Sequence, residues 1–576
     1  MYKLSDNIVS PLGLSTEENL EALLADQSQL RYYENLWGLP EPFVASLLDR
    51  NIIDEALCSL CKSCSSSLSD YTFFEKILLL SATKALQQVA VDPSSSRVVF
   101  VLSTTKGNVH LLSECGEGDF SRQDSIPLAA SALKIARHFG NGNTPLVVSN
   151  ACISGVCAQI EAMRLLRSGR YDYAVVMGAD MQSPFIISGF QSFKALSSEP
   201  CRPFDAARKG LNLGEAAATI VYASTRVAPA ALPQGQYWHA LSGAIRNDAN
   251  HISGPSRIGE GSYRALCAAL ENSGLTADQL ACVNTHGTAT LYNDEMESIA
   301  IDRAGLSQVP VNALKGYYGH TMGAAGVLEC ALTMCALDRG IVLGTRGYVS
   351  SGVSRPIRVS ADHQPTDKDA FVKLLSGFGG CNAALAFRKK IVDEVSPQCV
   401  SPTPQLKIQS SQISITEADD LTMLYRAHVG DYPKFFKMDP LSRLGFVASE
   451  MLLRQHPEIV AALKKGDEVA VRLFGRTGSL CDDTHYQATI QSPDNFFPSP
   501  AIFVYTLPNI VTGEIAIRDH FFGETTFLLM NHFDEQELLR QAHLAFQDAA
   551  TKYVVTGWVE CPDDDHHEAR LFFLQQ

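Results

Sequence analysis

The sequence predicts an α/β protein built from two unequal units. Residues 1 to about 390 alternate short apolar, strand-like runs with amphipathic helical patterns, as α/β folds do. Residues 391–416 are rich in Ser, Pro and Gln, which is typical of a linker. A second alternating region follows from about residue 417. We therefore predict one domain over 1–390, a linker over 391–416, and a second domain over 417–576.

Composition limits the class of protein. The chain has 576 residues, of which 46% are hydrophobic and 19% are charged, so it is long and apolar enough for a large core. A formal charge of −15 argues against nucleic acid as the main partner. No apolar run approaches the roughly 20 residues of a membrane helix, and the N-terminus lacks a secretory pattern. We therefore expect a cytoplasmic protein without a transmembrane segment.

The clearest strand predictions in the first unit are apolar runs, each followed by a turn or a helical pattern. After PLVVSN and a small-residue turn comes a helix-like segment, AQIEAMRLLRSG. The runs are VVFVLSTT (98–105), PLVVSN (145–150), YAVVMGAD (173–180) and AATIVYAS (217–224).

The second unit echoes the first. VVFVLSTTKGN (98–108) is similar to VAVRLFGRTGS (469–479), with Gly107 opposite Gly478, and YAVVMGAD is similar to YVVTGWVE (553–560). Carried along this alignment, Cys152 falls on Asn531, or on His532 with one more gap. Neither residue carries a thiol. The second unit therefore resembles a copy of part of the first without its cysteine.

Cys152 lies in VVSNACISGVC (147–157), which predicts a strand, a sharp turn and a helix, with the thiol at the turn. The free N–H groups and the dipole of a helix start favour an anion, so we expect a lowered pKa and more thiolate at Cys152. The small residues Ser154 and Gly155 leave room for a substrate. Taken alone, a cysteine in such a turn is more often structural than catalytic.

Two histidines favour the nucleophile. His286 ends an apolar run in VNTHGTATLYND (283–294), and His320 lies in the glycine-rich segment NALKGYYGHTMGAAGVLE (312–329). A lone histidine after a strand is usually structural. Two of them in glycine-rich turns, together with a cysteine at a helix start, fit convergence on one pocket.

Further segments complete the pattern. In the second histidine segment Glu329 is placed to reach back toward Lys315, and a glycine-rich turn surrounds Phe378 in LLSGFGGCNAAL (374–385). Together these segments resemble the β-ketoacyl synthases, the condensing enzymes of fatty-acid and polyketide synthesis. The resemblance covers about residues 1–390. The motifs that carry it are NACISG, NTHGTATLYND, KGYYGHTMGAAG, GFGGCN and RPFDAARKGLNLGEAA (202–217).

The resemblance implies a thiolase-like fold of α-β-α-β-α layers and a division of roles. Cys152 would carry the acyl chain as a thioester, and His286 and His320 would donate hydrogen bonds to the thioester carbonyl of a malonyl substrate. Lys315 and Glu329 would form a supporting pair. A Cys-His-His set implies a decarboxylating elongation enzyme, because priming synthases of this fold resemble Cys-His-Asn and thiolases use a second cysteine.

The same resemblance assigns the remaining site residues. The backbone N–H groups of Cys152 and Phe378 would form the oxyanion hole, and the Phe378 side chain would act as a gate. Thr288 and Thr290 match positions that contact a phosphopantetheine arm. Ser376 departs from the residue often found ahead of GFGG, which puts the gate or the acyl pocket in question.

The resemblance also implies partners. These are acyl carrier protein and its acyl and malonyl thioesters, with no metal and no cofactor beyond the carrier's phosphopantetheine. It implies a homodimer or a ketosynthase-type heterodimer, without choosing between fatty-acid, polyketide and aryl polyene synthesis. For docking of an acidic carrier we single out Arg208 and Lys209.

The second unit, 417–576, resembles the N-terminal half of a ketosynthase, most closely the chain-length-factor-like relatives. We predict a catalytically inactive half-unit that packs against the active domain and shapes the acyl tunnel; a stabilising appendage is the alternative.

Two other functions remain open from the sequence. One is a non-catalytic scaffold or chain-length partner of another ketosynthase. The other is an iron–sulfur protein that uses Cys58, Cys61 and Cys64 of CSLCKSC, against which stands the absence of a nearby fourth cysteine.

Overall fold

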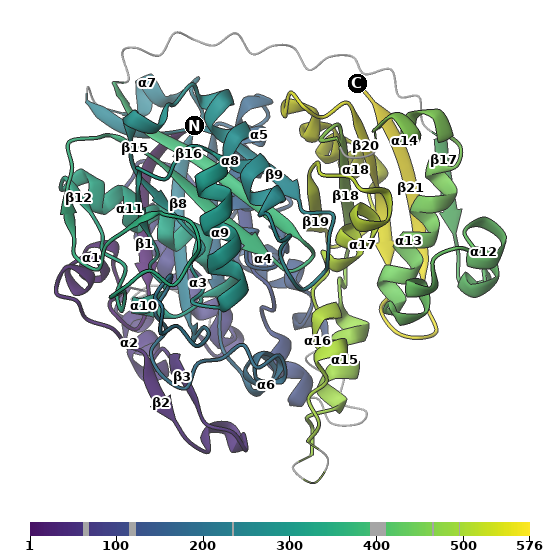
Figure 1. Ribbon diagram of the computed structural model, residues 1–576, viewed down its shortest axis with the longest axis horizontal. Coiled ribbons are helices and arrows are strands. Elements are labelled where there is room, and N and C mark those ends of the chain that lie inside the picture. Colours follow the sequence, from purple (N-terminus) through teal and green to yellow (C-terminus); the bar gives the residue numbers. More distant parts are fainter. Residues whose placement is uncertain are drawn as a thin grey trace.

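A single 16-stranded sheet joins the two halves of the protein (Figure 1). The structure is a computed structural model that describes residues 1–60, 68–114, 123–232, 235–391, 411–463, 466–492, 494 and 496–576. The strand order is β13-β11-β10-β15-β16-β9-β1-β8-β6-β4-β5-β19-β18-β20-β21-β17. The first eleven strands belong to the first half and the last five to the second.

One layer of the first half contains the strands that the sequence predicted. Their side chains are almost all buried because helices cover both faces, and this is why their apolar runs are continuous rather than alternating. In spatial order the strands are β1 (Tyr2–Val9), β8 (Ala216–Ala223), β6 (Tyr173–Asp180), β4 (Val98–Ser103) and β5 (Leu146–Val148). The outer cover is formed by α3 (Phe73–Leu86) and α4 (Leu128–His138).

A second layer of strands lies across two central helices, α5 (Ser154–Arg167) and α11 (Ala325–Asp338). Its strands are β9 (Gln236–Asn247), β16 (Cys381–Ile391), β15 (Ala370–Gly377), β10 (Leu280–Asn284), β11 (Pro310–Asn312) and β13 (Arg358–Val359). Its outer helices are α8 (Glu260–Ser273) and α9 (Leu291–Arg303). The result is the α-β-α-β-α order that the resemblance implies.

The two central helices touch backbone to backbone. A Cβ added at Gly155 of α5 would lie 2.8 Å from the backbone nitrogen of Gly326 in α11, and one added at Gly326 would lie 2.4 Å from that of Val156. These glycines are therefore needed for close approach. The contact brings the start of α5, next to Cys152, against the start of α11.

The second half repeats the first layer in reverse order. From the centre outward, β5, β4, β6, β8 and β1 on one side correspond to β19, β18, β20, β21 and β17 on the other. The two copies meet where β5 and β19 pair antiparallel, with Val148 opposite Leu528 and Val147 opposite Leu529. The second set comprises β19 (Thr525–Leu529), β18 (Val469–Gly475), β20 (Tyr553–Glu560), β21 (Glu568–Gln575) and β17 (Ser411–Ile415).

This order agrees with the repeat seen in the sequence. The similar segments 98–108 and 469–479 supply β4 and β18, and Gly107 and Gly478 both have a left-handed backbone, with φ of +47° and +59°. One boundary needs correction. The predicted linker over 391–416 is too long, because Ile391 ends β16 and Ser411–Ile415 pairs antiparallel with β21 as an edge strand. Residues 392–410 lie outside the described part of the chain.

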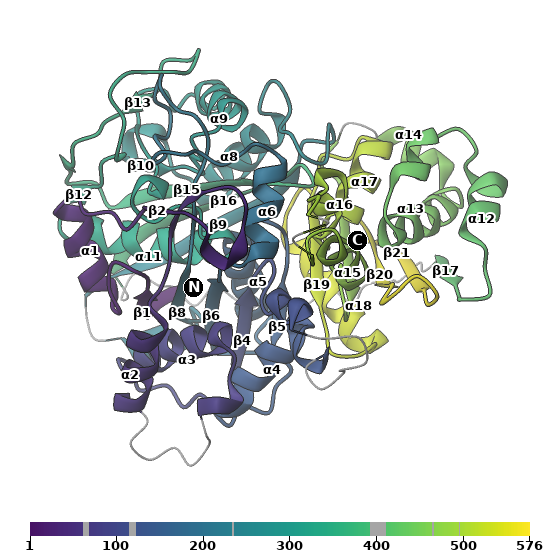
Figure 2. The ribbon, with the colours of Figure 1, turned by 90° about the horizontal axis from the view of Figure 1, so that it is seen from below.

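Among the helices of the second half, α13 (Pro440–Leu453), α17 (Ile510–Asp519) and α18 (Glu535–His543) pack on its strands, and Figure 2 shows them from below. Its other helices are α12 (Leu421–His428), α14 (Pro457–Leu463), α15 (Leu480–Ala488) and α16 (Pro500–Tyr505). The first half also has α1 (Thr16–Leu24), α2 (Arg50–Leu60), α6 (Pro184–Ser192), α7 (Ala228–Ala231), α10 (Lys315–Tyr318), β2 (Arg31–Tyr33), β3 (Phe43–Ser46), β7 (Leu213–Gly214), β12 (Ile341–Val342) and β14 (Gln364–Pro365). Within the described ranges, no helix combines the length and apolar character needed to span a bilayer.

Four buried charges join the halves beside the β5–β19 pair. Glu161 and Arg164 of α5 meet Arg472 of β18 and Glu524, which precedes β19. Each arginine contacts both carboxylates at 2.6–3.1 Å. The two arginines and two glutamates carry no net charge together, and each of the four side chains forms an ion pair with a residue of the other half.

Candidate active site

A strained turn presents Cys152. Between the end of β5 and the start of α5, Ala151 has a φ of +48°, which non-glycine residues rarely adopt. The hydroxyl of Ser154 holds this turn: it accepts from the Asn150 N–H at 2.7 Å and donates to the Ala151 carbonyl at 2.6 Å. The predicted strand, turn and helix are confirmed, and the strain falls next to the thiol, as it often does at functional sites.

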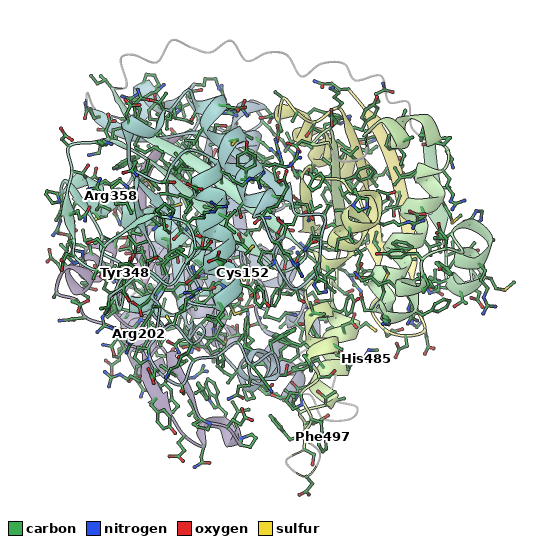
Figure 3. The ribbon with its side chains drawn as sticks, viewed as in Figure 1. Cys152, Arg202, Tyr348, Arg358, His485 and Phe497 are labelled. Carbon is green, nitrogen blue, oxygen red and sulfur yellow. The ribbon has the colours of Figure 1, made fainter. Side chains whose placement is uncertain are left out.

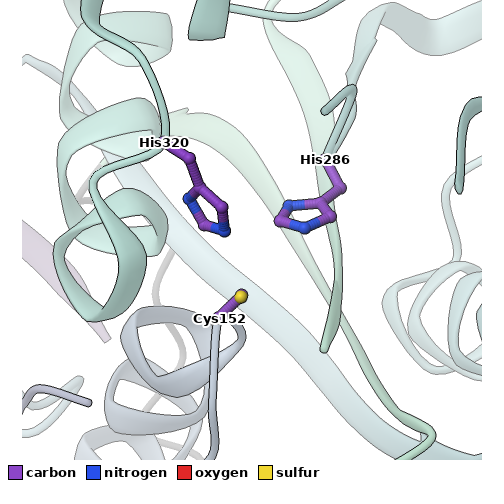
Figure 4. Close-up of side chains that lie close together, drawn as sticks. All are labelled: Cys152, His286 and His320. Atoms are coloured by element: carbon purple, nitrogen blue, oxygen red, sulfur yellow. The ribbon is translucent and has the colours of Figure 1, made fainter. Parts of the chain in front are cut away.

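Cys152, His286 and His320 converge on one point from three separate elements (Figure 4). One ligand-type atom from each lies within 4.8 Å of the other two, and the imidazole rings are 5.0 Å apart at 81°. His286 follows β10, and His320 follows α10. The structure thus brings together the three side chains that the sequence singled out.

The motif RPFDAARKGLNLGEAA (202–217) positions His320. The His320 N–H donates to the Asn212 carbonyl at 2.7 Å, and the Gly214 N–H donates to the His320 carbonyl at 3.0 Å. A Cβ at Gly214 would lie 2.0 Å from the carbonyl oxygen of Tyr318, so this approach requires glycine. The segment 202–217 therefore acts on the site through the backbone of His320.

Both imidazoles have lowered pKa values, which favours their neutral forms. Burial, reinforced by the nearby Lys315, lowers the pKa of His286 and of His320 well below the usual value. In His320, Nδ1 accepts the Met322 N–H at 3.1 Å, which leaves the ring proton on Nε2. Nε2 of His320 and Nδ1 of His286 are buried without a protein partner. The site therefore holds unused polar atoms that face a substrate position.

The thiol of Cys152 differs from the prediction. Burial raises its pKa to about 12, and the opposing effect of Lys315 is smaller. Desolvation thus outweighs the helix start, which begins two residues later, at Ser154. A pKa this far above neutral favours the protonated thiol at Cys152.

The predicted Lys315–Glu329 pair is present as part of a triad. Lys315 donates to Glu329 at 2.9 Å and to the His286 carbonyl at 2.6 Å. Lys373 of β15, which the sequence analysis missed, binds the other carboxylate oxygen and donates to the Thr285 carbonyl at 3.0 Å. Burial alone would raise the pKa of Glu329, but Lys315 and Lys373 lower it.

A second missed residue, Glu297 of α9, fixes the His286 loop. Its carboxylate accepts the backbone N–H groups of His286 and Gly287 at 2.5 and 2.8 Å. Burial raises the pKa of Glu297 to about 7. The signal in the sequence was an acidic residue on a helix face directly after the histidine loop, with spacing that brings it back to the loop.

The loop that carries Phe378 lies against Cys152. A Cβ added at Gly377 would be 3.4 Å from the backbone nitrogen of Cys152. This proximity is what an oxyanion hole shared by Cys152 and Phe378 requires. The Phe378 ring is half-buried among aromatic side chains, with centroids 5.5 Å from Phe193 and 6.5 Å from Phe190.

The second half contacts this site at two places, the Phe378 loop and the turn at Asn150. Asn509, just before α17, donates to the Phe378 carbonyl at 2.8 Å, and Gly513 packs on the backbone of Gly379. On the nucleophile side, the amide of Asn150 donates to the Thr525 carbonyl at 2.9 Å and accepts the Phe527 N–H at 3.2 Å. None of these contacts was predicted, because each joins residues far apart in the chain.

Thr288 and Thr290 lie together, with their hydroxyl oxygens 2.9 Å apart. Ser376, the departure from the family pattern, contacts the hydroxyl of Ser262 at 3.0 Å and the amide oxygen of Asn382 at 2.8 Å. These contacts tie β15 to α8 and β16 ahead of the Phe378 loop.

The docking prediction for Arg208 needs correction. Its guanidinium is buried and donates to the carbonyls of Asp205, Gly352 and Leu291. It is therefore a structural group rather than a surface charge. Lys209 is exposed and pairs with Glu199 at 2.7 Å.

The CxxCxxC prediction reaches beyond the described residues. Cys58 is exposed on α2. Cys61 and Cys64 lie outside the described part of the chain.

Comparisons with known proteins agree with the site. The Beta-ketoacyl synthase, N-terminal domain model matches residues 7–228, and the Beta-ketoacyl synthase, C-terminal domain model matches residues 239–348. A putative mitochondrial 3-oxoacyl-[acyl-carrier-protein] synthase of Schizosaccharomyces pombe is 28% identical over 423 residues, covering 66% of this chain and 97% of the relative. Nodulation protein E of Rhizobium meliloti is 31% identical over 278 residues, covering 47% of this chain and 68% of the relative.

Among solved structures, PfaC Keto synthase–Chain length factor is similar along the entire chain. It superposes with a TM-score of 0.79 at 13% identity, covering 100% of this chain and 78% of that one. At this identity the likeness shows the fold, which extends through the second half. On the two matching domain models, their order and the motifs within them, the chain belongs to the beta-ketoacyl synthase family.

Proposed function

We propose that the protein catalyses a decarboxylating condensation, in which an acyl group on Cys152 is joined to a malonyl group on acyl carrier protein. The product is a 3-oxoacyl-carrier thioester two carbons longer. The observation that carries the proposal is the convergence of the Cys152 thiol, which lies at a strained turn, with the imidazoles of His286 and His320. The proposal assigns catalytic roles to all three side chains.

The first step is transfer of the acyl group. The sulfur of Cys152 attacks the acyl thioester, the thioester bond to the carrier breaks, and the thiol proton ends on the released phosphopantetheine thiol. Negative charge develops on the carbonyl oxygen, where the N–H groups of Cys152 and Phe378 would receive it. One donor of this kind contributes about 3–4 kcal/mol to lowering a barrier.

The second step is decarboxylation. Nε2–H of His320 and the ring of His286 would donate to the thioester carbonyl of the malonyl group. Loss of CO₂ moves the electron pair of the broken C–C bond into an enolate, whose charge these donors stabilise. The lowered pKa values suit the role, since neutral donors leave the charge of the malonate carboxylate unpaired and favour its loss.

The third step forms the new bond. The enolate carbon attacks the acyl carbonyl on Cys152, and the Cys152–acyl thioester bond breaks. One proton from solvent restores the thiol. Thr288 and Thr290 would hold the phosphopantetheine arm through their paired hydroxyls, and the triad of Lys315, Glu329 and Lys373 would fix the backbone ahead of and at His286.

The second half would serve as a permanent support for the site. Its contacts reach both the Asn150 turn and the Phe378 loop. Aromatic side chains from both halves also meet near Phe378. The ring centroid of Phe503 of α16 lies 6.0 Å from that of Phe193 and 5.6 Å from that of Phe190. This supports a role for α16 in setting the space open to the acyl chain.

The test is condensation by purified protein supplied with acyl-carrier and malonyl-carrier thioesters, read by mass spectrometry. We expect CO₂ and a 3-oxoacyl carrier two carbons longer, both lost in Cys152→Ala. Cys267→Ala, which removes a half-buried thiol of α8, is the matched control and should retain activity. If Cys152 takes up no acyl group from any carrier thioester, the non-catalytic partner of another ketosynthase becomes the better reading.

A further inference from the structure

The second half carries a group of metal-ligand side chains unrelated to Cys152. Cys481 and His485 are four residues apart on α15 and therefore share one face of that helix. Cys561 and Asp564 belong to the turn CPDD that follows β20. Figure 3 shows His485 on the second half, apart from Cys152.

Three of these side chains meet. Asp564 joins α15 through both carboxylate oxygens, one 2.9 Å from Nε2 of His485 and the other 3.8 Å from the sulfur of Cys481. One ligand-type atom from each of Cys481, His485 and Asp564 lies within 4.8 Å of the other two. Cys561 lies outside this group, and its thiol donates to the Asp563 carbonyl at 3.4 Å.

The spacing suits a tetrahedral zinc site. With Zn–S near 2.3 Å and Zn–N or Zn–O near 2.0 Å, neighbouring ligand atoms are about 3.3–3.8 Å apart. The 3.8 Å between Sγ of Cys481 and Oδ1 of Asp564 already falls in this range. The 2.9 Å between Nε2 of His485 and Oδ2 of Asp564 is shorter than this range. Thiolate and imidazole donors favour Zn²⁺ over Mg²⁺ or Ca²⁺.

The surroundings distinguish the group from an ordinary surface His–Asp pair. His485 and Asp564 are exposed, but Cys481 and Cys561 beneath them are each 3% exposed. Two more carboxyls, Asp482 and Asp439, are buried nearby, and one oxygen of each has no hydrogen-bond partner among the described residues. Acidic groups therefore gather beside Cys481.

We propose that Cys481, His485 and Asp564 bind one zinc ion and that the Cys561 thiol is recruited as its fourth ligand. Binding would displace the protons of the two thiols and leave two thiolates, one carboxylate and a neutral imidazole around the metal. The ion would clamp α15 to the β20–β21 turn. Because α15 also carries Asp483, which pairs with Lys106 of the first half at 2.5 Å, the clamp would support the contact between the halves.

The experiment uses the full chain, reduced, stripped of metal and titrated with Co²⁺ as a spectroscopic substitute for Zn²⁺. We expect one equivalent to give the visible bands of tetrahedral cobalt with thiolate-to-metal charge transfer, and Zn²⁺ to displace it. Cys152, His286 and His320 are a second candidate donor set, so the titration is repeated on Cys152→Ala, which should keep the bands. Cys481→Ser and Cys561→Ser should each abolish the two-thiolate spectrum, and His485→Ala should weaken binding at least tenfold.

A measurement on the unaltered protein covers the case in which these variants fail to fold. Zn²⁺ should protect Cys481 and Cys561, but not Cys267, from alkylation read by peptide mass spectrometry. The proposal is overturned if no tetrahedral cobalt spectrum appears, if the spectrum is lost in Cys152→Ala, or if Zn²⁺ protects neither thiol. Isolation of Cys481 and Cys561 as a disulfide that forms in preference to metal binding would also overturn it.

Discussion

The side-chain amide of Asn509 donates a hydrogen bond, 2.8 Å long, to the carbonyl oxygen of Phe378. Asn509 belongs to the second half, and Phe378 belongs to the loop that lies against the nucleophile in the first. A Cβ on Gly379 would lie 2.6 Å from the same amide nitrogen. The second half therefore touches the Phe378 loop directly, and Gly379 makes room for the Asn509 side chain.

Replacing Asn509 should impair the site more than the fold. Asn509→Leu leaves the Phe378 carbonyl without its donor, at a cost of about 1–3 kcal/mol. If the loop shifts as a result, acylation of Cys152 should slow by roughly 5- to 150-fold. Asn509→Asp, of nearly the same shape, should be as slow because a carboxylate repels the carbonyl oxygen. Single-turnover acylation measures this rate, with half-exposed Asn531→Ala as the control. Wild-type rates in both Asn509 variants would show that the contact is incidental.

Truncation after Ile391 should abolish the folded active domain. It would expose the edge of β5 and leave Glu161 and Arg164 without Arg472 and Glu524. Breaking buried ion pairs costs about 3–5 kcal/mol, and an open strand edge promotes aggregation. Expression and size-exclusion chromatography should show insoluble or aggregated protein.

A matched experiment separates loss of the second half from loss of chain continuity. Replacing residues within 392–410 by a protease site and cutting there should leave the two pieces associated and active, because the β5–β19 pair remains. A truncated protein that is monodisperse and condenses normally would contradict the supporting role of the second half.

Alkylation of Cys152 should report its raised pKa. With a pKa of about 12, the thiolate fraction, and hence the alkylation rate, should rise roughly tenfold per pH unit from pH 7 to 9.5 without levelling off. A small thiol with an ordinary pKa near 8.5 serves as reference and should level off above that pH. Peptide mass spectrometry gives the rate at Cys152. A plateau below pH 8 would instead support the lowered pKa expected from the helix start.

The triad beneath His286 predicts an order of stability. Glu329→Gln leaves Lys315 and Lys373 as two buried ammonium groups without their carboxylate and should destabilise by about 3–5 kcal/mol. Lys373→Met removes one of the two positive charges, leaves the Lys315–Glu329 pair neutral, and should cost less. Because the folded pKa of Glu329 lies below its ordinary value, its contribution is complete at neutral pH and declines as the pH falls through the folded pKa. Thermal and urea unfolding of both variants test the order; a more stable Glu329→Gln would contradict it.

The sequence predicted much of this arrangement because the relevant signals are local. Strands β4 and β6 are continuous apolar runs, and Cys152, His286 and His320 each lie in a turn with its own small residues. The repeat was visible because β4 and β18 share a pattern and a left-handed glycine. A local pattern, however, does not say which edges meet, so the pairing of β5 with β19 could not be inferred from it.

The failures share one physical origin, which is burial created by distant segments. Arg208 reads as a surface charge in RPFDAARKG, yet the carbonyls of Gly352 and Leu291 enclose it. Cys152 reads as an activated thiolate, yet desolvation by the surrounding layers dominates. Lys373 and Glu297 were both detectable omissions: a lysine inside the apolar run AFVKLL needs a buried partner, and Glu297 follows the His286 loop on a helix.

The antiparallel contact between β5 and β19 also has a consequence for assembly. When two separate chains form such a contact, its occupancy depends on their concentrations. Here both strands belong to one polypeptide, so the contact forms as a unimolecular event and persists on dilution. Each molecule therefore carries both halves at a fixed one-to-one ratio, and the β5 edge is closed to pairing with a second chain.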